Sequence, residues 1–514
     1  MYLYFSKRLS LILIPTSYFL LYLPIVLQIN FYQNDDWYYY KQVELFLQFK
    51  FRLLNDIAPS FYGAGIPASL FAYFFGLQNI PILTLIVSTL SVFVFLVILK
   101  INKITGFAYY LSLLSFIFFP IFSYSVLGFM TENYFLLYVL ASLLFFNLFI
   151  NKNNTYLLIF AYLLALLSFF VKQNGIVLLF IYFIYLLYIK NYKQSVIAIT
   201  LFIGTALFYF FIFPKTFEMT ESKFSILTFL PLNVAYVVYN TLCYFLVFSA
   251  GFFSFIKFKK VKLSKINLMV IAVILVTILT QLYFYSKFKL FPYFGNTYSY
   301  LGFLYGSIEG PKPAFKFIPS LFILYTYLAP LMLILFLTYL YINNKIFKDK
   351  IAFFYFSSFV VFSVFNQTIA KFYDRYLLIP FVLFLLFLAN YFKNYNFKVT
   401  NFLVVSPILL ANIYLIFVFS IEFVTTNNYA WNKAFSLVNT NKIEPSTVFA
   451  NGAFNEKYSN KGLNSSKFYI SWEKPHSVTS NFTKIEEHTF KNLNLFVKSP
   501  TVYIYKNLNY EQPH

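Results

Sequence analysis

Two adjacent carboxylates, Asp35 and Asp36, follow the first long apolar segment of the chain. A carboxylate takes a proton from a hydroxyl group, and general base catalysis of this kind contributes about 10²–10⁴-fold to a rate. Polar side chains recur at steps of three and four along residues 41–52, a stretch that is otherwise apolar, which predicts a helix lying along a membrane surface. Asn34 is placed to cap that helix, whose positive end favours nearby carboxylates. The pair is therefore predicted at the edge of a bilayer.

Further ionisable residues fall at the ends of predicted membrane segments that face the same side. Glu132 lies between the third and fourth spans, Lys172 between the fifth and sixth, and Arg375 and Tyr376 before the twelfth. Cationic side chains bind phosphate, arginine in a bidentate manner and lysine as a point charge. A departing phosphate needs charge stabilisation more than it needs an acid. We expect these residues to share one outward-facing cavity with the acidic pair, suited to a sugar on a lipid phosphate.

The elements that must position these residues are membrane helices. Of the 514 residues, 60% are hydrophobic, 24% aromatic and only 11% charged, unlike a soluble globular domain. Apolar segments recur with the length of about 20 residues that a helix needs to cross a bilayer. The sequence predicts an all-α polytopic membrane protein with about thirteen transmembrane helices. The predicted spans are 9–29, 81–99, 107–129, 133–150, 155–171, 174–190, 194–213, 233–256, 266–286, 317–342, 351–369, 376–392 and 401–423.

The basic residues predict the orientation. They give the chain a net charge of +22, but they lie in short loops between apolar spans and not on one folded face. This is the positive-inside distribution, so we expect no nucleic-acid partner and a cytoplasmic N-terminus. The longer loops 30–80, 214–232 and 287–316 then fall outside. Glycines and a proline interrupt the segment 61–80, which predicts a re-entrant or interfacial helix and not a crossing.

The composition changes after residue 424, where Asn, Ser, Lys and Glu become frequent. The alternation in Thr501–Tyr505 predicts a strand. We therefore predict a membrane domain over 1–424, with the first outer loop carrying the acidic pair, and a small mixed α/β extracytoplasmic domain over 425–514. Cys243 is the only cysteine and all three histidines lie in the tail, so neither a disulfide framework nor an obvious metal cluster is predicted.

Taken together, these motifs resemble the multi-pass GT-C glycosyltransferases, in particular the bacterial relatives of protein O-mannosyltransferases and lipid A aminoarabinose transferases. The resemblance rests on the acidic pair with its following aromatic residues, and on the segments Phe129–Asn133, Phe170–Gly175 and Asp374–Pro380. It implies an enzyme of the bacterial inner membrane that transfers a sugar from a polyprenyl-phosphate donor. The acceptor would be a hydroxyl of a glycan, lipid or protein at the outer face, and the anomeric configuration would be inverted.

The resemblance also implies roles for single residues. Asp35 matches the catalytic carboxylate, and Asp36 stands where relatives usually carry Glu, which leaves the division of labour between the two open. Glu132 matches a second loop acid that helps to position the acceptor or the base. The residues expected to bind the donor phosphate are Lys172, Arg375 and Tyr376. A divalent cation, Mg²⁺ or Mn²⁺, bridging the acidic pair and the phosphate is a further option, because hard cations take oxygen ligands.

Plainer interpretations stand beside these. The acidic pair also suits a solvated helix cap, Glu132 an ordinary helix-start acid, and Lys172 and Arg375 side chains that reach for the membrane interface. A transporter or flippase for a lipid-linked saccharide would use a similar outer cavity. It would also predict polar residues near the membrane midplane or a paired repeat, and the sequence has neither. A scaffold protein would not need the acids at all.

Overall fold

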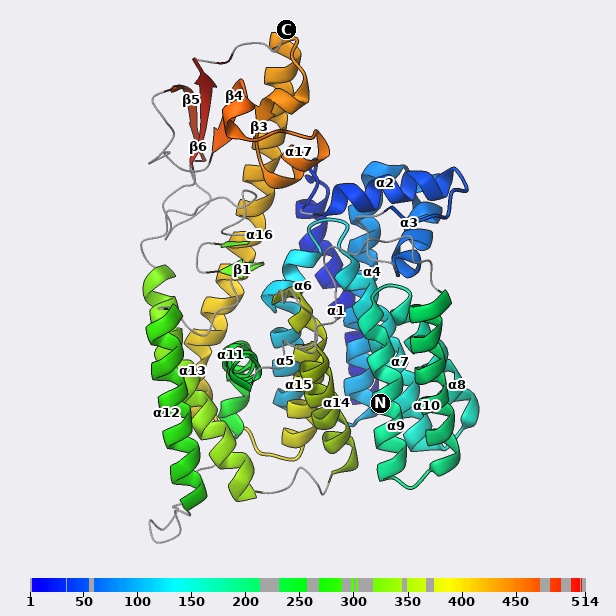
Figure 1. Ribbon diagram of the computed structural model, residues 1–514. Coiled ribbons are helices and arrows are strands. Elements are labelled where there is room, and N and C mark those ends of the chain that lie inside the picture. Colours follow the sequence, from blue (N-terminus) through cyan, green and yellow to red (C-terminus); the bar gives the residue numbers. More distant parts are fainter. Residues whose placement is uncertain are drawn as a thin grey trace.

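A bundle of helices forms the body of the protein, and a small sheet domain stands at one end of it (Figure 1). The structure, a computed structural model, describes residues 2–33, 35–54, 60–212, 231–256, 268–288, 297–299, 302–303, 318–343, 349–366, 374–471, 481–490, 501–508 and 510. Helix α2 lies across the end of the bundle that carries the sheet domain (Figure 1). Asn34, predicted as a helix cap, lies outside the described residues, and α2 is instead preceded by Asp35 as its N-cap residue.

The first half of the chain is helical almost throughout. Its elements are α1 (Tyr2–Val26), α2 (Asp36–Leu47), α3 (Tyr62–Phe75), η1 (Leu77–Asn79), α4 (Ile80–Ile101), α5 (Gly106–Ile117), α6 (Pro120–Ser125), α7 (Thr131–Lys152), α8 (Thr155–Phe169), η2 (Gln173–Ile176), α9 (Val177–Tyr188), α10 (Tyr192–Leu207) and η3 (Phe208–Ile212). The second half of the bundle consists of α11 (Pro231–Phe248), η5 (Ala250–Phe255), α12 (Leu268–Phe288), α13 (Ile318–Asn343), α14 (Lys350–Asn366), η7 (Asp374–Leu377), α15 (Leu378–Phe392) and α16 (Val399–Asn441). A short hairpin, β1 (Tyr298–Ser299) with β2 (Gly302–Phe303), lies between α12 and α13.

The prediction of a mostly helical chain with several helices of membrane-spanning length is confirmed. Each predicted span contains a helix, and in the part of the chain that the structure describes seven stretches are long and apolar enough to cross a bilayer. These are Leu9–Val26, Leu77–Ile101, Thr131–Lys152, Tyr192–Phe211, Leu324–Tyr341, Asp374–Phe392 and Val399–Asn441. The remaining predicted spans fall on helices whose apolar part, among the described residues, is shorter and has 10–17 residues. Within the described residues, seven helices are thus long and apolar enough to cross a membrane, and the number of thirteen crossings stays a prediction.

The predicted span 107–129 is not one continuous helix. Helix α5 ends at Ile117, and α6 begins at Pro120 after an extended residue, Phe119, with φ −74° and ψ 125°. A residue before proline is biased toward this extended geometry because the proline ring clashes with its helical conformation. The break turns the chain so that the segment from Val126 to Met130 forms a buried turn ahead of α7.

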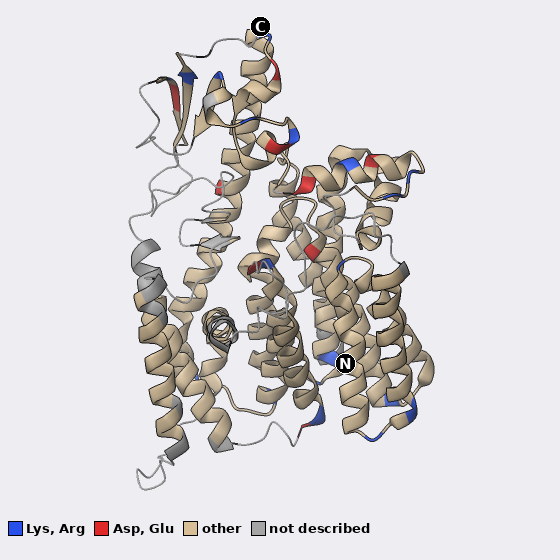
Figure 2. Ribbon diagram, viewed as in Figure 1, with Lys and Arg blue, Asp and Glu red and all other residues tan. Residues whose placement is uncertain are grey.

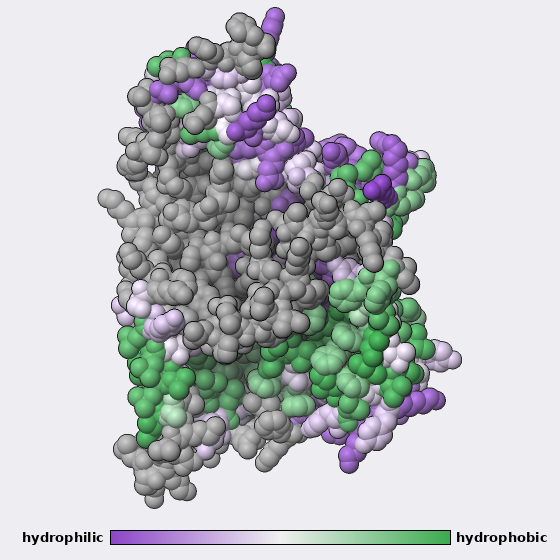
Figure 3. All heavy atoms as spheres, in the orientation of Figure 1, coloured by the Kyte–Doolittle hydropathy of each residue, from purple (hydrophilic) through white to green (hydrophobic). Residues whose placement is uncertain are grey.

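The surface of the bundle suits a bilayer. Large apolar side chains are exposed along α8, α10 and α12, where a space-filling view shows hydrophobic residues (Figure 3). Hydrophilic residues cover α2 and the sheet domain in the same view (Figure 3). Charged residues gather near the two ends of the bundle and at one interior point close to the end that carries α2 (Figure 2). An exposed apolar surface of this extent is typical of a protein that is embedded in a membrane or covered by a partner.

Helix α3 occupies part of the segment 61–80, which was predicted not to cross the membrane. It has only 14 residues and is not among the helices long enough to span a bilayer. Its first turn packs on the end of α8, where the Gly63 N–H donates to the Phe170 carbonyl at 2.7 Å. A Cβ on Gly63 would stand 2.7 Å from Val171 Cγ2, so this close approach requires glycine. The contact holds α3 against the segment that leads to Lys172.

The C-terminal domain contains the mixed helix and strand that its composition predicted. Its elements are η8 (Pro445–Thr447), β3 (Val448–Phe449), α17 (Gly452–Lys457), η9 (Leu463–Ser465), β4 (Phe468–Ser471), β5 (Phe482–Thr489) and β6 (Thr501–Asn507), with strand order β3-β4-β6-β5. Helix α16 runs for 43 residues through the predicted boundary at 424 without a break. The sheet packs against the C-terminal part of α16. There, Tyr429 of α16 stacks on His488 of β5, and Lys433 pairs with Glu486 at 2.5 Å.

Candidate active site

The loop that carries the acidic pair is held by residues from the end of the chain. The Asn30 side chain donates to Asn432 Oδ1 at 2.9 Å, and the Asn30 N–H donates to Asn428 Oδ1 at 3.0 Å, both on the outer part of α16. Farther along, Trp37 Nε1 donates to Glu456 Oε2 on α17 at 3.3 Å. These contacts join segments about 400 positions apart in sequence. They fix the place from which Asp35 projects.

Asp35 faces Arg375. Its Oδ2 accepts a hydrogen bond from Arg375 Nη1 at 3.1 Å, and 40% of the Asp35 side chain is exposed, against 15% for Arg375. Arg375 belongs to η7, the short helix that leads into α15. The two residues are 340 positions apart. The exposed acid is thus presented to solvent while one of its oxygens touches the interior cation.

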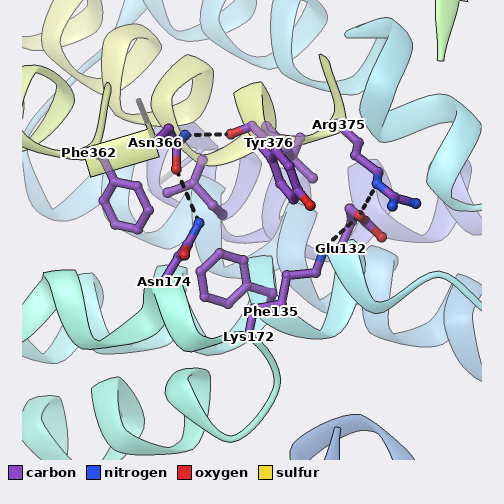
Figure 4. Close-up of a pocket in the computed structure, with 10 residues that line it drawn as sticks. Glu132, Phe135, Lys172, Asn174, Phe362, Asn366, Arg375 and Tyr376 are labelled. Carbon is purple, nitrogen blue, oxygen red and sulfur yellow. Dashed lines mark hydrogen bonds and ion pairs between the residues drawn. The ribbon is translucent and has the colours of Figure 1, made fainter. Parts of the chain in front are cut away.

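Glu132 is the centre of the cluster. It lies in the first turn of α7 with only 4% of its side chain exposed. Its Oε1 accepts from Lys172 Nζ at 2.6 Å and lies 3.8 Å from Arg375 Nε (Figure 4). A buried carboxylate is retained in the charged form only when such partners offset its loss of hydration. Glu132 therefore lies between the two cations that were predicted to bind phosphate.

Tyr376 lies beside both cations. Lys172 Nζ is 5.6 Å from the centre of the Tyr376 ring and Arg375 Cζ is 5.9 Å from it, distances at which a ring attracts a cation. Lys172 precedes η2 in an extended conformation, which directs its side chain back toward α7. Burial lowers the pKa of the Lys172 ammonium, and the Glu132 carboxylate opposes that shift.

Asn366 joins the elements of the site and was not predicted. Its Oδ1 accepts from Asn174 Nδ2 at 3.2 Å, and its own Nδ2 donates to the Tyr376 carbonyl at 3.0 Å (Figure 4). The residue is buried and closes α14, so one side chain ties α14 to η2 and η7. In the sequence, Asn366 is marked only as a single amide side chain at the end of an apolar segment, which did not point to a role in the site.

A small cavity separates these side chains. It is lined by Glu132, Phe135, Lys172, Asn174, Phe362, Asn366, Arg375, Tyr376, Leu378 and Ile379 (Figure 4). Its volume of about 20 Å³ is room for about one water molecule. The polar side is formed by the ion pairs, and the apolar side continues into the helices. Any group larger than a water molecule therefore fits only if the lining side chains move.

Asp36 does not face the cavity. Its side chain is buried, and Oδ2 accepts from the Phe129 N–H at 2.7 Å, in the turn before α7. Burial raises the pKa of Asp36 well above its usual range, although the Phe129 N–H opposes the shift. The neighbouring acids thus have different surroundings, one exposed beside Arg375 and one enclosed by backbone.

The predicted option of a divalent cation is not supported by this arrangement. The oxygens of the acidic pair that make contacts are directed to different partners, Asp35 to Arg375 and Asp36 to Phe129. Among the described residues, no group of three or more His, Cys, Asp or Glu side chains is arranged to hold a metal ion. The acidic pair therefore does not offer the shared set of oxygens that bridging would need.

Gly128 allows the turn before α7 to approach Asp36. A Cβ at this position would stand 2.2 Å from Gln33 Oε1 and 2.4 Å from Asp36 Oδ2. We expect Gly128→Ala to destabilise the protein by about 1–3 kcal/mol, the usual cost of overpacking a dense interior. Thermal melting in detergent measures it, with Gly204→Ala as the control, because a Cβ on Gly204 meets nothing within 4 Å. Equal melting temperatures of both variants and wild type would contradict this packing.

Asp374, next to Arg375, is also fixed by backbone. Both of its carboxylate oxygens accept from the Thr297 N–H, each at 2.9 Å, and both residues are buried. This contact ties η7 to the segment before β1. Asp374 therefore helps to hold the turn from which Arg375 reaches Asp35 and Glu132.

The structure thus gathers Asp35, Glu132, Lys172, Arg375 and Tyr376, and directs Asp36 elsewhere. Comparison of the chain with known protein families, with characterised proteins and with solved structures finds no match. The function therefore has to be argued from the chemistry of these side chains.

Proposed function

We propose that this chain is a GT-C type membrane glycosyltransferase that moves a sugar from a polyprenyl-phosphate donor to a hydroxyl group of a glycan, lipid or protein acceptor. The observation that carries the proposal is the cluster of Asp35, Glu132, Lys172 and Arg375 at one end of a membrane bundle. Two cations and an exposed carboxylate are the groups that such a reaction needs. Charged residues buried this close to lipid are costly, which favours a functional role.

The cations would bind the donor phosphate. A phosphodiester entering the cavity competes with the carboxylates for Lys172 and Arg375, whose fork of N–H groups matches two phosphate oxygens. Glu132 already lies within 3.8 Å of both cations, so it would hold them in place while the phosphate enters. The uncharged ring of Tyr376 lies beside the two cations and lines the cavity. The apolar lining formed by Phe135, Phe362, Leu378 and Ile379 would face the first part of the prenyl chain.

Asp35 would be the general base. Once the phosphate has taken its place on Arg375, the carboxylate is released to accept the proton of the acceptor hydroxyl. The hydroxyl oxygen attacks the anomeric carbon of the sugar, and the bond from that carbon to the phosphate oxygen breaks. The electron pair leaves with the polyprenyl phosphate, whose added negative charge is stabilised by Lys172 and Arg375. Attack from the face opposite the leaving group inverts the anomeric configuration.

The site would lie at the outer face of a bacterial inner membrane. With a cytoplasmic N-terminus, α1 delivers the acidic loop to the outside, and α2 and the C-terminal domain lie on the same side of the bundle (Figure 1). The exposure of Asp35 on that side suits an acceptor that arrives from the aqueous phase. The distribution of basic residues in the sequence supports the same orientation.

The direct test is transfer of radiolabelled sugar from a panel of polyprenyl-phosphate donors in membranes that contain the wild-type protein. Transfer above that of membranes without the protein would support the enzyme and identify its donor sugar. Absence of transfer from every donor, together with movement of a lipid-linked saccharide across the membrane, would overturn the proposal in favour of a flippase. Membrane insertion of the protein is checked in each preparation, so that an absence of transfer is not caused by a misfolded protein.

A further inference from the structure

Asp36 belongs to a buried polar cluster that the transfer reaction does not use. Gln33, one turn earlier in the loop, is buried, and its Nε2 donates to the Tyr124 carbonyl at 3.1 Å. The Asp36 N–H donates to the Gln33 carbonyl at 2.9 Å. Asp36 Oδ2 accepts from the Phe129 N–H at 2.7 Å. Together these bonds join the loop after α1 to the turn before α7.

Two side-chain oxygens approach Gly128 inside this cluster. The point where a Cβ on Gly128 would stand is 2.2 Å from Gln33 Oε1 and 2.4 Å from Asp36 Oδ2, so the two side chains pack against the same glycine. In the part of the chain that the structure describes, neither Gln33 Oε1 nor Asp36 Oδ1 has a hydrogen-bond donor. The Gln33 amide is not reversed to relieve this, because its nitrogen is needed by the Tyr124 carbonyl.

A proton would complete the cluster. Two acceptors without donors in one buried site cost free energy, since each has lost its hydration without gaining a hydrogen bond. A protonated carboxyl group is both donor and acceptor. It would satisfy Gln33 while still accepting from Phe129.

We infer that Asp36 acts as an uncharged carboxylic acid that donates its hydrogen to Gln33 Oε1 and, by accepting from Phe129, positions the turn that delivers Glu132. It is a positioning residue and not a second base. This inference rests on the proposed function only for its effect on transfer. It separates the roles of the two adjacent acids, Asp35 charged and reactive, Asp36 neutral and fixed.

The surroundings favour the neutral form. Burial is the main cause that raises the pKa of Asp36, and the carboxylates Asp35 and Glu132 raise it further. The hydroxyl groups of Tyr32, Tyr40 and Tyr134 are also close enough to interact with it electrostatically.

The activity test compares Asp36→Asn, Asp36→Leu and Asp35→Asn in the transfer assay. Asn is neutral and retains an oxygen for the Phe129 N–H, so we expect its rate to fall by less than about threefold. Leu leaves that buried N–H without an acceptor, a loss of about 1–3 kcal/mol that corresponds to about 5–150-fold. Asp35→Asn reports on the base. A correctly inserted Asp36→Asn protein as inactive as Asp35→Asn would overturn the inference, because the charge of Asp36 would then be required.

A second measurement does not need activity. Near neutral pH, the infrared carbonyl band of protonated carboxylic acids in the wild-type protein should contain one component that is lost in Asp36→Asn and retained in Asp35→Asn. Absence of the difference would overturn the inference whatever the protein catalyses. Conversely, the wild-type protein could show this band and yet transfer no sugar from any donor. That result would support a neutral Asp36 and reject the proposed glycosyltransferase activity.

Stability should follow pH in a direction set by the same group. Because the pKa of Asp36 is raised in the folded protein, its contribution to stability is complete below about pH 4, the usual carboxyl value, and is lost as pH rises through the folded value. Asp36→Asn does not titrate. The melting temperature of the wild type relative to this variant should therefore decrease as pH increases above about 4, and an opposite slope would contradict a neutral Asp36.

Discussion

Replacing Asp35 by Asn should reduce transfer by about 10²–10⁴-fold, the usual contribution of a general base. The change is nearly isosteric, so the fold should survive, and it removes the group that would accept the proton. It also removes the carboxylate that occupies Arg375 Nη1 at 3.1 Å. A donor phosphate would then meet less competition, and its KM should stay unchanged or fall while kcat collapses.

The matched control for this variant is Glu44→Gln. Glu44 is an exposed carboxylate on α2, the helix that Asp35 precedes, and it does not line the cavity. The same loss of one negative charge near the acidic loop should leave the rate within about twofold, because exposed charges at this distance are screened. Steady-state transfer at varied donor concentration gives kcat and KM for both variants. Full activity of Asp35→Asn would remove the base from the mechanism.

Replacing Arg375 by Lys should lower kcat/KM by about 10²–10³-fold, the usual cost of removing a group that stabilises charge in the transition state. The guanidinium contacts Asp35 through Nη1 at 3.1 Å and lies 3.8 Å from Glu132 through Nε. A lysine ammonium keeps the charge but offers a single point, so it does not serve both acids and a phosphate at once. The decrease in kcat/KM therefore shows how much the bidentate geometry of the guanidinium contributes beyond its positive charge.

Arg52→Lys provides the comparison for that variant, because Arg52 is an exposed arginine near the end of the same outer loop segment and does not line the cavity. It should transfer sugar like the wild type. Labelled donor bound to detergent-solubilised protein separates binding from chemistry. If Arg375→Lys bound and transferred as well as Arg52→Lys, the phosphate-binding role of Arg375 would be rejected.

Part of the site was predictable because it depends on residue types at the ends of apolar segments. The expense of charge in a membrane singles out Asp35, Glu132, Lys172 and Arg375, wherever they come to lie. Their meeting in one cluster follows only if the helix ends face the same side, which the positive-inside pattern indicated. The structure brings these side chains together, whereas their catalytic roles stay predictions.

Other parts were not predictable because they depend on backbone geometry. The sequence gives two adjacent acids no reason to differ, yet α2 begins between them, so that one faces Arg375 and the other the Phe129 N–H. Asn366 is similar, since its role exists only where the end of α14 meets η2 and η7. Gly128 looks unremarkable until Gln33 and Asp36 are placed against it.

The sequence by itself determined the membrane class, the positions of the helices, the separate composition of the tail and the kinds of charged groups available. These properties are local, because each segment's hydrophobicity and periodicity decide whether it is stable in lipid or in water, whatever its distant neighbours are. Only the tertiary structure decided which acid meets which cation, how narrow the cavity is and which carboxylate is enclosed. Those outcomes depend on side chains hundreds of positions apart, whose distances are set by helix packing and loop closure and not by any local pattern.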